Sequence, residues 1–317
     1  MSVPTAVAVH GGAGRVGRER LTGPGRRRFF DGLSAALSAA HEILRRGGSA
    51  VRAVTTAVRV LEDDEVFNAG RGAALCADGS VELSASVMNG RNLAVGAMVG
   101  LRRTRNPVLG AAALLDHKHG LLFGEQADNY ARAAGLDQME TDYFVTPVRV
   151  RQWQALCGSK RVVLDHSGDE EAHGTVGAVA RDRRGNLAAA TSTGGLVNQL
   201  PGRVGDSPVV GAGTWADRRC AISATGSGDA FARIAFARRV ADFVELAGME
   251  PAAAARRALD EVARVHGRGG CVLIGVEGAP VAVFNSPHMI RGWVVAGAEA
   301  RMAIAPGDEA ARRPGDR

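Results

Sequence analysis

A polar segment at residues 158–173 divides the chain into two halves, and in each half strands come in runs and helices in blocks. The segment contains Gly-Ser-Lys and a run of mainly acidic residues, a composition typical of an exposed linker. Before it, residues 5–10 alternate like a strand, and residues 26–46 carry apolar side chains at helical spacing. Grouped elements favour two sheets sandwiched between helices over the regular alternation of a βαβ fold. We therefore expect an α+β fold in one integrated domain, with one half at residues 1–174 and the other at 175–317.

The remaining elements are predicted from apolar spacing and from capping residues. Gly47-Gly48 ends the first long helix, and Ser49 caps a second helix that runs to Leu61. The polar tail from about residue 298 is expected to be disordered. Strands are expected at 73–76, 81–88, 93–99, 176–181, 187–191, 219–224, 271–276, 281–284 and 292–295, and helices at 128–134, 147–156, 229–246 and 251–266.

Composition indicates a globular protein with a substantial core. Of the 317 residues 46% are hydrophobic, which argues against disorder, and the length suits one large domain or two small ones. The net charge is +6, and Lys118 and Lys160 are the only lysines, so almost all positive charge is arginine. These arginines are scattered, without interleaved aromatic residues for base stacking, so a nucleic-acid partner is not expected.

The four cysteines are far apart and form no C-x-x-C pair. This pattern favours reduced, buried thiols in a cytoplasmic protein over disulfides or zinc. The N-terminus shows no secretory apolar region, and no apolar run reaches transmembrane length, so no membrane partner is expected.

Two motifs suggest cofactor sites but fit them poorly. Residues 12–17 read G-x-G-x-x-G, yet the following sequence contains Gly23-Pro24-Gly25 and does not open the regular helix of a dinucleotide site. His117 and His119 lack acidic or cysteine partners, so we interpret them as surface residues rather than metal ligands. The sequence therefore predicts no organic cofactor.

Thr175 follows Gly174 directly after the linker and is a candidate nucleophile. An internal threonine is a poor nucleophile, whereas at a chain terminus its own α-amine can accept the hydroxyl proton. Glycine tolerates strained backbone that exposes its carbonyl to attack. The pair therefore predicts cleavage of the chain between Gly174 and Thr175.

Glycine-rich turns downstream carry groups suited to an amino-acid substrate. Arg203 can grip a carboxylate bidentately, and Asp206 can hold an ammonium group three residues later. The Thr225 hydroxyl and the Gly226 N–H can form an oxyanion hole. Each turn alone is consistent with ordinary turn chemistry. Their succession after a Gly-Thr pair favours a site that recognises an amino acid over ordinary turn chemistry.

These motifs resemble the plant-type L-asparaginase/isoaspartyl peptidase family, which belongs to the N-terminal nucleophile hydrolases. The resemblance extends from about residue 5 to residue 296. It is carried by Thr175-Val-Gly-Ala-Val-Ala, Gly185-Asn-Leu-Ala-Ala-Ala-Thr-Ser-Thr-Gly-Gly, Pro201-Gly-Arg-Val-Gly-Asp-Ser-Pro, His10-Gly-Gly-Ala-Gly, Phe67-Asn-Ala-Gly, Asn106-Pro-Val and Gly124-Glu.

The resemblance implies a four-layer αββα sandwich, a precursor that cuts itself into α and β chains, and an (αβ)2 assembly. It implies hydrolysis of L-asparagine or β-aspartyl peptides to release L-aspartate, without ranking the two substrates. A glycosylasparaginase-like hydrolase, or an amino-acid-binding homologue that never matures, are the alternatives. The implied roles are Thr175 as nucleophile, Thr193 as its supporting hydroxyl, Arg203, Asp206 and Gly228 as substrate ligands, Thr225 and Gly226 as substrate-binding oxyanion hole, and Asn68 as a neighbour of the nucleophile.

The resemblance also implies a structural sodium ion held by backbone carbonyls of the segment 61–71, at Leu61, Glu62, Phe67, Ala69 and Arg71. Two acids usual in the family are replaced here by Ser84 and Asn89. Neither position is expected to contact substrate, so they bear on cleavage rate and substrate preference rather than on reaction class.

Overall fold

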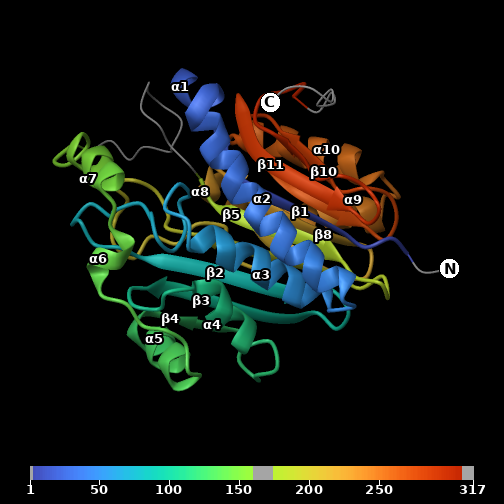
Figure 1. The fold of residues 1–317 in the computed structure, drawn as a ribbon, viewed down its shortest axis with the longest axis horizontal. Coiled ribbons are helices and arrows are strands. Elements are labelled where there is room, and N and C mark those ends of the chain that lie inside the picture. Colours follow the sequence, from blue (N-terminus) through green and yellow to red (C-terminus); the bar gives the residue numbers. More distant parts are fainter. Residues whose placement is uncertain (1–2, 160–173, 309–317) are drawn as a thin grey trace.

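The computed structural model describes residues 3–159 and 174–308, and within these ranges the strands form two sheets (Figure 1). The predicted linker lies outside the described residues from position 160 to position 173. The large sheet has the strand order β12-β11-β1-β5-β6-β2-β3-β4, and the small sheet has the order β10-β9-β8-β7. The strands are β1 (Ala6–Gly14), β2 (Leu83–Asn89), β3 (Ala94–Leu101), β4 (Leu121–Phe123), β5 (Val176–Arg181), β6 (Leu187–Thr193), β7 (Thr214–Ala216), β8 (Cys220–Gly226), β9 (Gly269–Gly275), β10 (Val281–Phe284), β11 (His288–Val295) and β12 (Arg301–Ala303).

The two halves of the chain share the large sheet. Strands β5 and β6 come from the second half but lie between β1 and β2 of the first half. Every neighbouring pair in this sheet is antiparallel except β3 and β4. The segment that begins at Gly174 therefore enters the middle of the sheet.

Helices cover the outer faces of both sheets. α2 and α3 pack on β1, β5 and β6 of the large sheet, while α9 and α10 pack on the small sheet (Figure 1). The two sheets face each other across small apolar side chains such as Ala8, Ala189 and Ala221, which allow close approach. The helices are α1 (Arg18–Leu21), α2 (Gly23–Arg45), α3 (Ala50–Glu62), α4 (Pro107–Ala113), α5 (Gly124–Ala133), α6 (Thr141–Phe144), α7 (Pro147–Gln154), α8 (Gly228–Arg233), α9 (Phe236–Glu245) and α10 (Pro251–Arg264).

Local signals explain where the first long helices end and begin. The Gly48 N–H bonds to the carbonyl of Ile43 at the end of α2, which confirms the predicted stop. The Ser49 hydroxyl accepts from the Arg52 N–H and caps α3, as predicted. In α3, Val54, Val58 and Leu61 lie on the buried face.

Several predicted elements are corrected. The helix expected at 229–246 is broken into α8 and α9 by Ala235, whose φ of 50° is left-handed. No strand forms at 73–76, where the Cys76 N–H instead bonds to the Ser80 carbonyl in a turn. The tail is ordered beyond residue 298, because β12 pairs with β11 and Ile304 is fully buried, while residues 309–317 lie outside the described residues.

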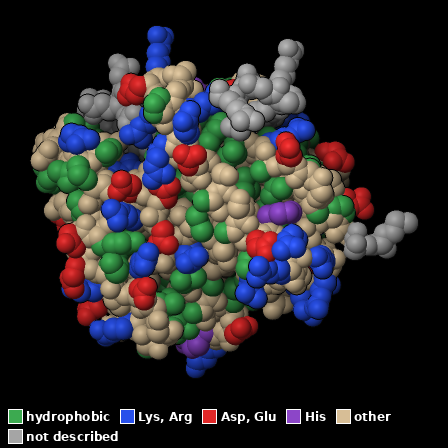
Figure 2. All heavy atoms as spheres, viewed as in Figure 1, with side chains coloured by type: hydrophobic (Ala, Val, Ile, Leu, Met, Phe, Trp, Pro, Cys, Tyr) green, Lys and Arg blue, Asp and Glu red, His purple; other side chains and the backbone are tan. Residues whose placement is uncertain are grey.

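The surface shows how charges and cysteines are distributed. Positive side chains on the face shown in Figure 2 lie in separate groups among acidic and apolar ones. Across the described ranges, no helix combines the length and apolar character needed to cross a bilayer. All four cysteines are free, and three of them are buried as predicted, but the prediction of a buried thiol is wrong for Cys157, which is exposed.

Candidate active site

Thr175 lies at the start of β5, beside the end of β6. The pairing of Val176 with Ser192 brings Thr175 next to Thr193. The Thr175 Oγ1 donates to Thr193 Oγ1 over 3.1 Å and lies 3.2 Å from Ser207 Oγ. The Thr175 side chain is buried, so its hydroxyl is held by two other hydroxyls in a water-poor environment. Sheet pairing thus builds the predicted Thr175–Thr193 contact.

The Gly174–Thr175 peptide is packed tightly against the end of β1. Gly12 has a φ of 119°, and a Cβ added to it would lie 2.6 Å from the Gly174 nitrogen. A Cβ added to Gly174 would lie 2.9 Å from Thr225 Oγ1. Glycine is therefore required at position 12 by both conformation and space, and the peptide bond lies between β1 and Thr225.

A buried hydrogen-bond network lies beneath Thr175. The His10 Nδ1 bonds to the Thr175 carbonyl over 3.0 Å, and its Nε2 lies 2.9 Å from Ser223 Oγ. Burial lowers the pKa of His10 to about 3, so the ring is neutral, and donation from Nδ1 leaves Nε2 to accept from Ser223. The Ser223 hydroxyl also lies 2.7 Å from Thr191 Oγ1. The network continues through Thr214 and Ser86 to the Ser207 carbonyl.

Arg203 and Asp206 converge on Gly228. A Cβ added to Gly228 would lie 2.7 Å from Asp206 Oδ1 and 3.0 Å from Arg203 Nη2. Arg203 bonds to Asp229 Oδ2 over 2.7 Å and to Gln199 Oε1 over 3.3 Å. The Asp229 side chain is 66% exposed, so this ion pair is easily exchanged for a substrate carboxylate.

Asp206 is buried with one orphaned oxygen. Only 3% of the residue is exposed, and within the described part of the chain its Oδ2 has no hydrogen-bond partner. Burial raises the pKa of Asp206 to about 7, although the Arg203 charge opposes this shift. A buried carboxylate in this state is suited to receive a cationic ligand group.

Thr225 and Gly226 lie at the end of β8, opposite Gly174. The Thr225 side chain is fully buried, and its Oγ1 finds no hydrogen-bond partner among residues 3–159 and 174–308. Gly226 has a φ of 142°, and a Cβ there would lie 2.3 Å from the Arg268 carbonyl oxygen. The pair thus offers an unused hydroxyl beside a backbone that requires glycine.

Asn68 fastens the turn that follows Thr193. Its Nδ2 donates to the Gly195 carbonyl over 2.7 Å, and its Oδ1 accepts from the Ala74 N–H over 2.8 Å. Its side chain thus links this turn to Ala74, and no bond to Thr175 occurs within the described residues. Asn68 therefore positions the turn next to the candidate nucleophile.

The segment 61–71 brings backbone carbonyls together. A Cβ added to Gly72 would lie 2.4 Å from the Glu65 carbonyl oxygen and 2.8 Å from that of Phe67, while the Glu62 carbonyl accepts from the Arg71 N–H. Of the predicted sodium ligands, the Phe67 carbonyl therefore lies beside that of Glu65, whereas the carbonyls of Leu61 and Glu62 accept backbone hydrogen bonds. No cluster of three metal-binding side chains occurs in the described ranges.

Glu62 connects this segment to the strand that ends at Thr193. Its Oε1 accepts from Ser192 Oγ over 2.6 Å and from the Val108 N–H over 3.0 Å. Burial raises the pKa of Glu62 to about 8. Sequence reasoning assigned only a backbone role to Glu62.

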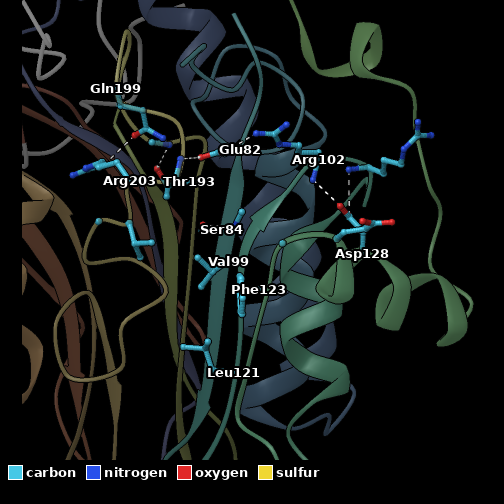
Figure 3. A pocket seen from close by; sticks show the side chains of 18 of the residues that line it. Glu82, Ser84, Val99, Arg102, Leu121, Phe123, Asp128, Thr193, Gln199 and Arg203 are labelled. Carbon is cyan, nitrogen blue, oxygen red and sulfur yellow. Dashed lines mark hydrogen bonds and ion pairs between the residues drawn. The ribbon is translucent and has the colours of Figure 1, made fainter. Parts of the chain in front are cut away.

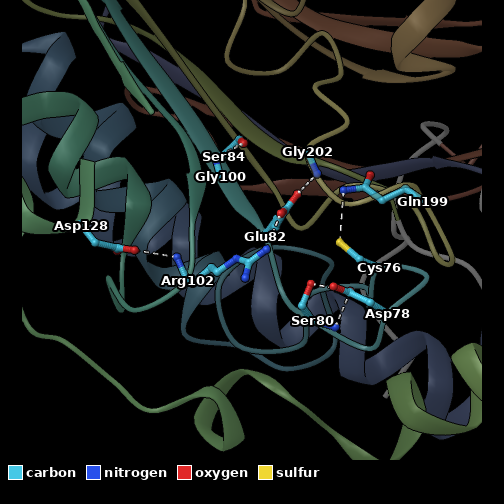
Figure 4. Close-up of polar contacts among 10 residues, drawn as sticks. All are labelled: Cys76, Asp78, Ser80, Glu82, Ser84, Gly100, Arg102, Asp128, Gln199 and Gly202. Atoms are coloured by element: carbon cyan, nitrogen blue, oxygen red, sulfur yellow. Dashed lines mark hydrogen bonds and ion pairs between the residues drawn. The ribbon is translucent and has the colours of Figure 1, made fainter. Parts of the chain in front are cut away.

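A cavity of about 890 Å³ opens beside Thr193 and Arg203 (Figure 3). Glu82 supports its wall, because its carboxylate accepts from Arg102 Nη2 over 2.8 Å and from the Gly202 N–H over 2.7 Å (Figure 4). This contact holds the turn that presents Arg203.

The two replaced acids occupy different surroundings. Ser84 pairs with Thr193 in the sheet, accepts from the Gly100 N–H over 3.3 Å and lines the cavity. Asn89 lies at the other end of β2, where its side chain accepts from the Arg91 N–H. Only Ser84 is therefore near the candidate site.

The sequence patterns did not predict a role for three residues near Thr175: His10, Ser207 and Ser223. The first two lie inside quoted motifs, and a histidine at the end of a buried strand before Gly-Gly was the available signal. Ser223 had no local signal, because only the packing of the two sheets brings it to His10.

Comparisons with known proteins give a consistent result. Residues 3–304 match the family model described as asparaginase. The chain is 42% identical over 298 residues to an isoaspartyl peptidase of Salmonella typhimurium, covering 92% of this chain and 95% of that protein. It is also 42% identical over 298 residues to an isoaspartyl peptidase of Escherichia coli (92% and 93% covered) and 40% identical over 296 residues to an isoaspartyl peptidase/L-asparaginase of Danio rerio (92% and 91% covered). The predicted family resemblance is confirmed.

Proposed function

The chain belongs to the asparaginase family, and from this we propose that it is a self-cleaving threonine hydrolase of L-asparagine and β-aspartyl peptides. The observation that carries the proposal is the placement of Thr175. Thr175 directly follows Gly174, and its hydroxyl bonds to Thr193. The unpaired polar atoms of Asp206 and Thr225 belong to the same site.

In maturation, Thr175 Oγ1 attacks the Gly174 carbonyl carbon, and the peptide C–N bond breaks as an ester forms. The former amide nitrogen becomes the α-amine of Thr175, and water then hydrolyses the ester to free the Gly174 carboxylate. The tight contacts of Gly174 with Gly12 and Thr225 support this step by fixing its carbonyl. The products are chains of residues 1–174 and 175–317.

In hydrolysis, the freed α-amine acts as base, since an ordinary α-amine has a pKa of about 7.7–8.0. Arg203 holds the substrate α-carboxylate, while Asp206 and the Gly228 backbone hold its α-ammonium group. Thr175 Oγ1 attacks the β-amide carbonyl, and Thr225 Oγ1 with the Gly226 N–H stabilises the oxyanion. Each such donor is worth roughly 3 kcal/mol. Ammonia or a peptide amine leaves, and water releases L-aspartate from the acyl-enzyme.

We assign the fold to the four-layer αββα sandwich of N-terminal nucleophile hydrolases and the assembly to an (αβ)2 heterotetramer. The two facing sheets with helices outside them support the first assignment. Free cysteines support a reducing, cytoplasmic setting. We assign no organic cofactor to the enzyme. A structural sodium ion is held by backbone carbonyls of Leu61, Glu62, Phe67, Ala69 and Arg71. Replacing sodium by choline should lower the unfolding temperature, and an unchanged melting curve would remove the ion from the proposal.

The Thr175→Ala variant tests the central role. It should remain one chain in denaturing mass spectrometry and should lose at least about 10³-fold in turnover of L-asparagine and β-Asp-Leu. Thr175→Ser is the matched control and should retain cleavage and part of the activity, because it keeps a hydroxyl. Cleavage of Thr175→Ala at Gly174 would overturn self-cleavage.

Two further results would favour the alternatives. Turnover of a glycosylated asparagine but not of β-Asp-Leu would indicate a glycosylasparaginase-like enzyme. A single intact chain that binds aspartate in calorimetry without turnover would indicate a binding protein. Native mass spectrometry of the same sample measures the (αβ)2 assembly.

A further inference from the structure

Among residues 3–159 and 174–308, nothing covers part of the large sheet on the face that packs against the small sheet. The small sheet ends at β7, which packs on β6 and β2 of the eight-stranded sheet. Strand β4 and the Val99 end of β3 lie beyond it, and the cavity beside Thr193 is found there (Figure 3). The uncovered strip therefore begins at the candidate active site and runs to the sheet edge.

Apolar side chains line this strip. Because alternate residues of a strand point to opposite faces, Leu122 packs into the main core, whereas Leu121 and Phe123 face the cavity. Leu121 is 52% exposed and Phe123 is 74% exposed. We call Val99, Leu121 and Phe123 the apolar floor.

The floor is continuous with the candidate nucleophile's surroundings. Ser84 pairs with Thr193 on β6, and Val99 pairs with Phe123 on β4, so the strand order gives the row Thr193, Ser84, Val99, Phe123. Three strand spacings separate the ends of this row, a distance of about 14 Å, which an extended peptide covers with about four residues.

The other residues of the candidate site bind other parts of the substrate, so the leaving group points toward the apolar floor. Arg203 and Asp206 take the charged head of the substrate, and Thr225 with Gly226 takes the oxyanion under the proposed function. The cavity opens at Thr193 and at Arg203, whereas Thr225 and Gly226 do not line it. A peptide attached to the β-carbonyl therefore extends over the apolar floor.

Arginines at the far side of the cavity suit a peptide carboxylate. Arg103 and Arg132 line it there, whereas Arg102 bonds to Glu82 beside the turn that presents Arg203. The partner of Arg103 is Glu140, and both side chains are more than half exposed, so this ion pair is weak and exchangeable. Cationic groups thus lie where a short peptide ends.

We propose that the apolar floor is a subsite for the leaving peptide, which makes isoaspartyl peptides of several residues, with an apolar residue near position four, the preferred substrate class. This proposal rests on the proposed function. Binding so far from the reacting carbonyl contributes equally to ground and transition states and lowers KM rather than raising kcat.

The test compares two peptides on the mature enzyme: β-Asp-Ala-Ala-Leu and β-Asp-Ala-Ala-Ser. We expect kcat/KM to be about five-fold higher for the leucine peptide, through KM, because a leucine side chain is partly buried. In Phe123→Ser this ratio should fall toward one, while turnover of L-asparagine, which has no extension, stays unchanged. Leu246→Ser removes a leucine that is 79% exposed and lies outside the cavity, and should keep the wild-type ratio.

Three results would overturn the subsite. A ratio near one in the wild-type enzyme, with normal turnover of L-asparagine, would remove the subsite but leave the proposed function standing. Equal loss for all substrates in Phe123→Ser, with dissociation in native mass spectrometry, would show that the floor is a contact between copies of the chain. Absence of turnover for every substrate would remove the proposed function and the subsite together.

Discussion

Two hydroxyl-bearing residues on one face of β8 differ in how their hydrogen bonds are used. The Ser223 hydroxyl lies within bonding distance of His10 Nε2 and Thr191 Oγ1, inside a network of buried side chains. Thr225, two residues later on the same strand, is equally buried, but its Oγ1 has no partner in the described residues. An unpaired buried hydroxyl costs stability, so its presence indicates a ligand group that arrives during function.

The same contrast separates the two sides of Thr175. The side toward His10 is saturated with hydrogen bonds, and it fixes the backbone of Thr175 through the carbonyl. The side toward Asp206 keeps an orphaned oxygen and a carboxyl group of raised pKa. We infer that the first side positions the nucleophile, whereas the second side sacrifices stability for substrate binding.

Asp206→Asn should have the largest effect. Loss of the carboxylate that holds the substrate ammonium group should lower kcat/KM by about 10²–10³-fold. In the wild-type enzyme kcat/KM should rise as the pH passes about 7, because Asp206 must be ionised to bind the cation. The variant should lose the part of the rise near pH 7 and keep only the rise that the Thr175 α-amine, with a pKa of about 7.7–8.0, gives as the base. A wild-type profile shared by Asp206→Asn would exclude Asp206 as its source.

The same variant should become more stable than the wild type as the pH rises. The pKa of Asp206 is higher in the folded protein than in the unfolded chain, so its contribution to the free energy of unfolding is present below about pH 4 and is lost as the pH rises through about 7. Asp206→Asn lacks this loss and should be more stable than wild type at pH 8, by about 4 kcal/mol, and not at pH 4. Denaturant unfolding at both pH values measures the difference.

Thr225→Val should have the next largest effect on catalysis. The substitution keeps the shape of the side chain and removes the hydroxyl, so kcat should fall about 10²-fold while KM changes little. Stability should stay the same or rise, because no hydrogen bond is broken. A marked fall in unfolding temperature would show that Thr225 is a structural residue.

Ser223→Ala, the matched change on the same strand, should show the opposite signature. It leaves His10 Nε2 without its partner and should lower the free energy of unfolding by about 1–3 kcal/mol. The effect on kcat should be only several-fold, because Ser223 acts through His10 on the position of Thr175. Equal effects of the two variants on kcat and stability would remove the distinction between the two sides.

Reading along the chain was sufficient for features that depend on neighbouring residues. The caps of α2 and α3, the position of the strands that flank Thr175, and the residues of the Gly-rich turns were predicted from local patterns. The break at Ala235 was missed, because a helical pattern of apolar residues continues across it. Strand β12 was missed as well, since a strand of three residues carries too little sequence pattern and is ordered only by pairing with β11.

Local patterns thus specified the candidate nucleophile, the predicted cut site and the candidate substrate ligands, because those depend on residue type and short spacing. Tertiary structure decided which groups surround them. His10 bonds to Thr175 across 165 residues of sequence because β1 pairs with β5. Ser223 bonds to His10 across 213 residues because the two sheets pack on each other, and Ser207 approaches Thr175 from a turn. The apolar floor exists only because an eight-stranded sheet faces a four-stranded one, and that mismatch has no trace in any single segment.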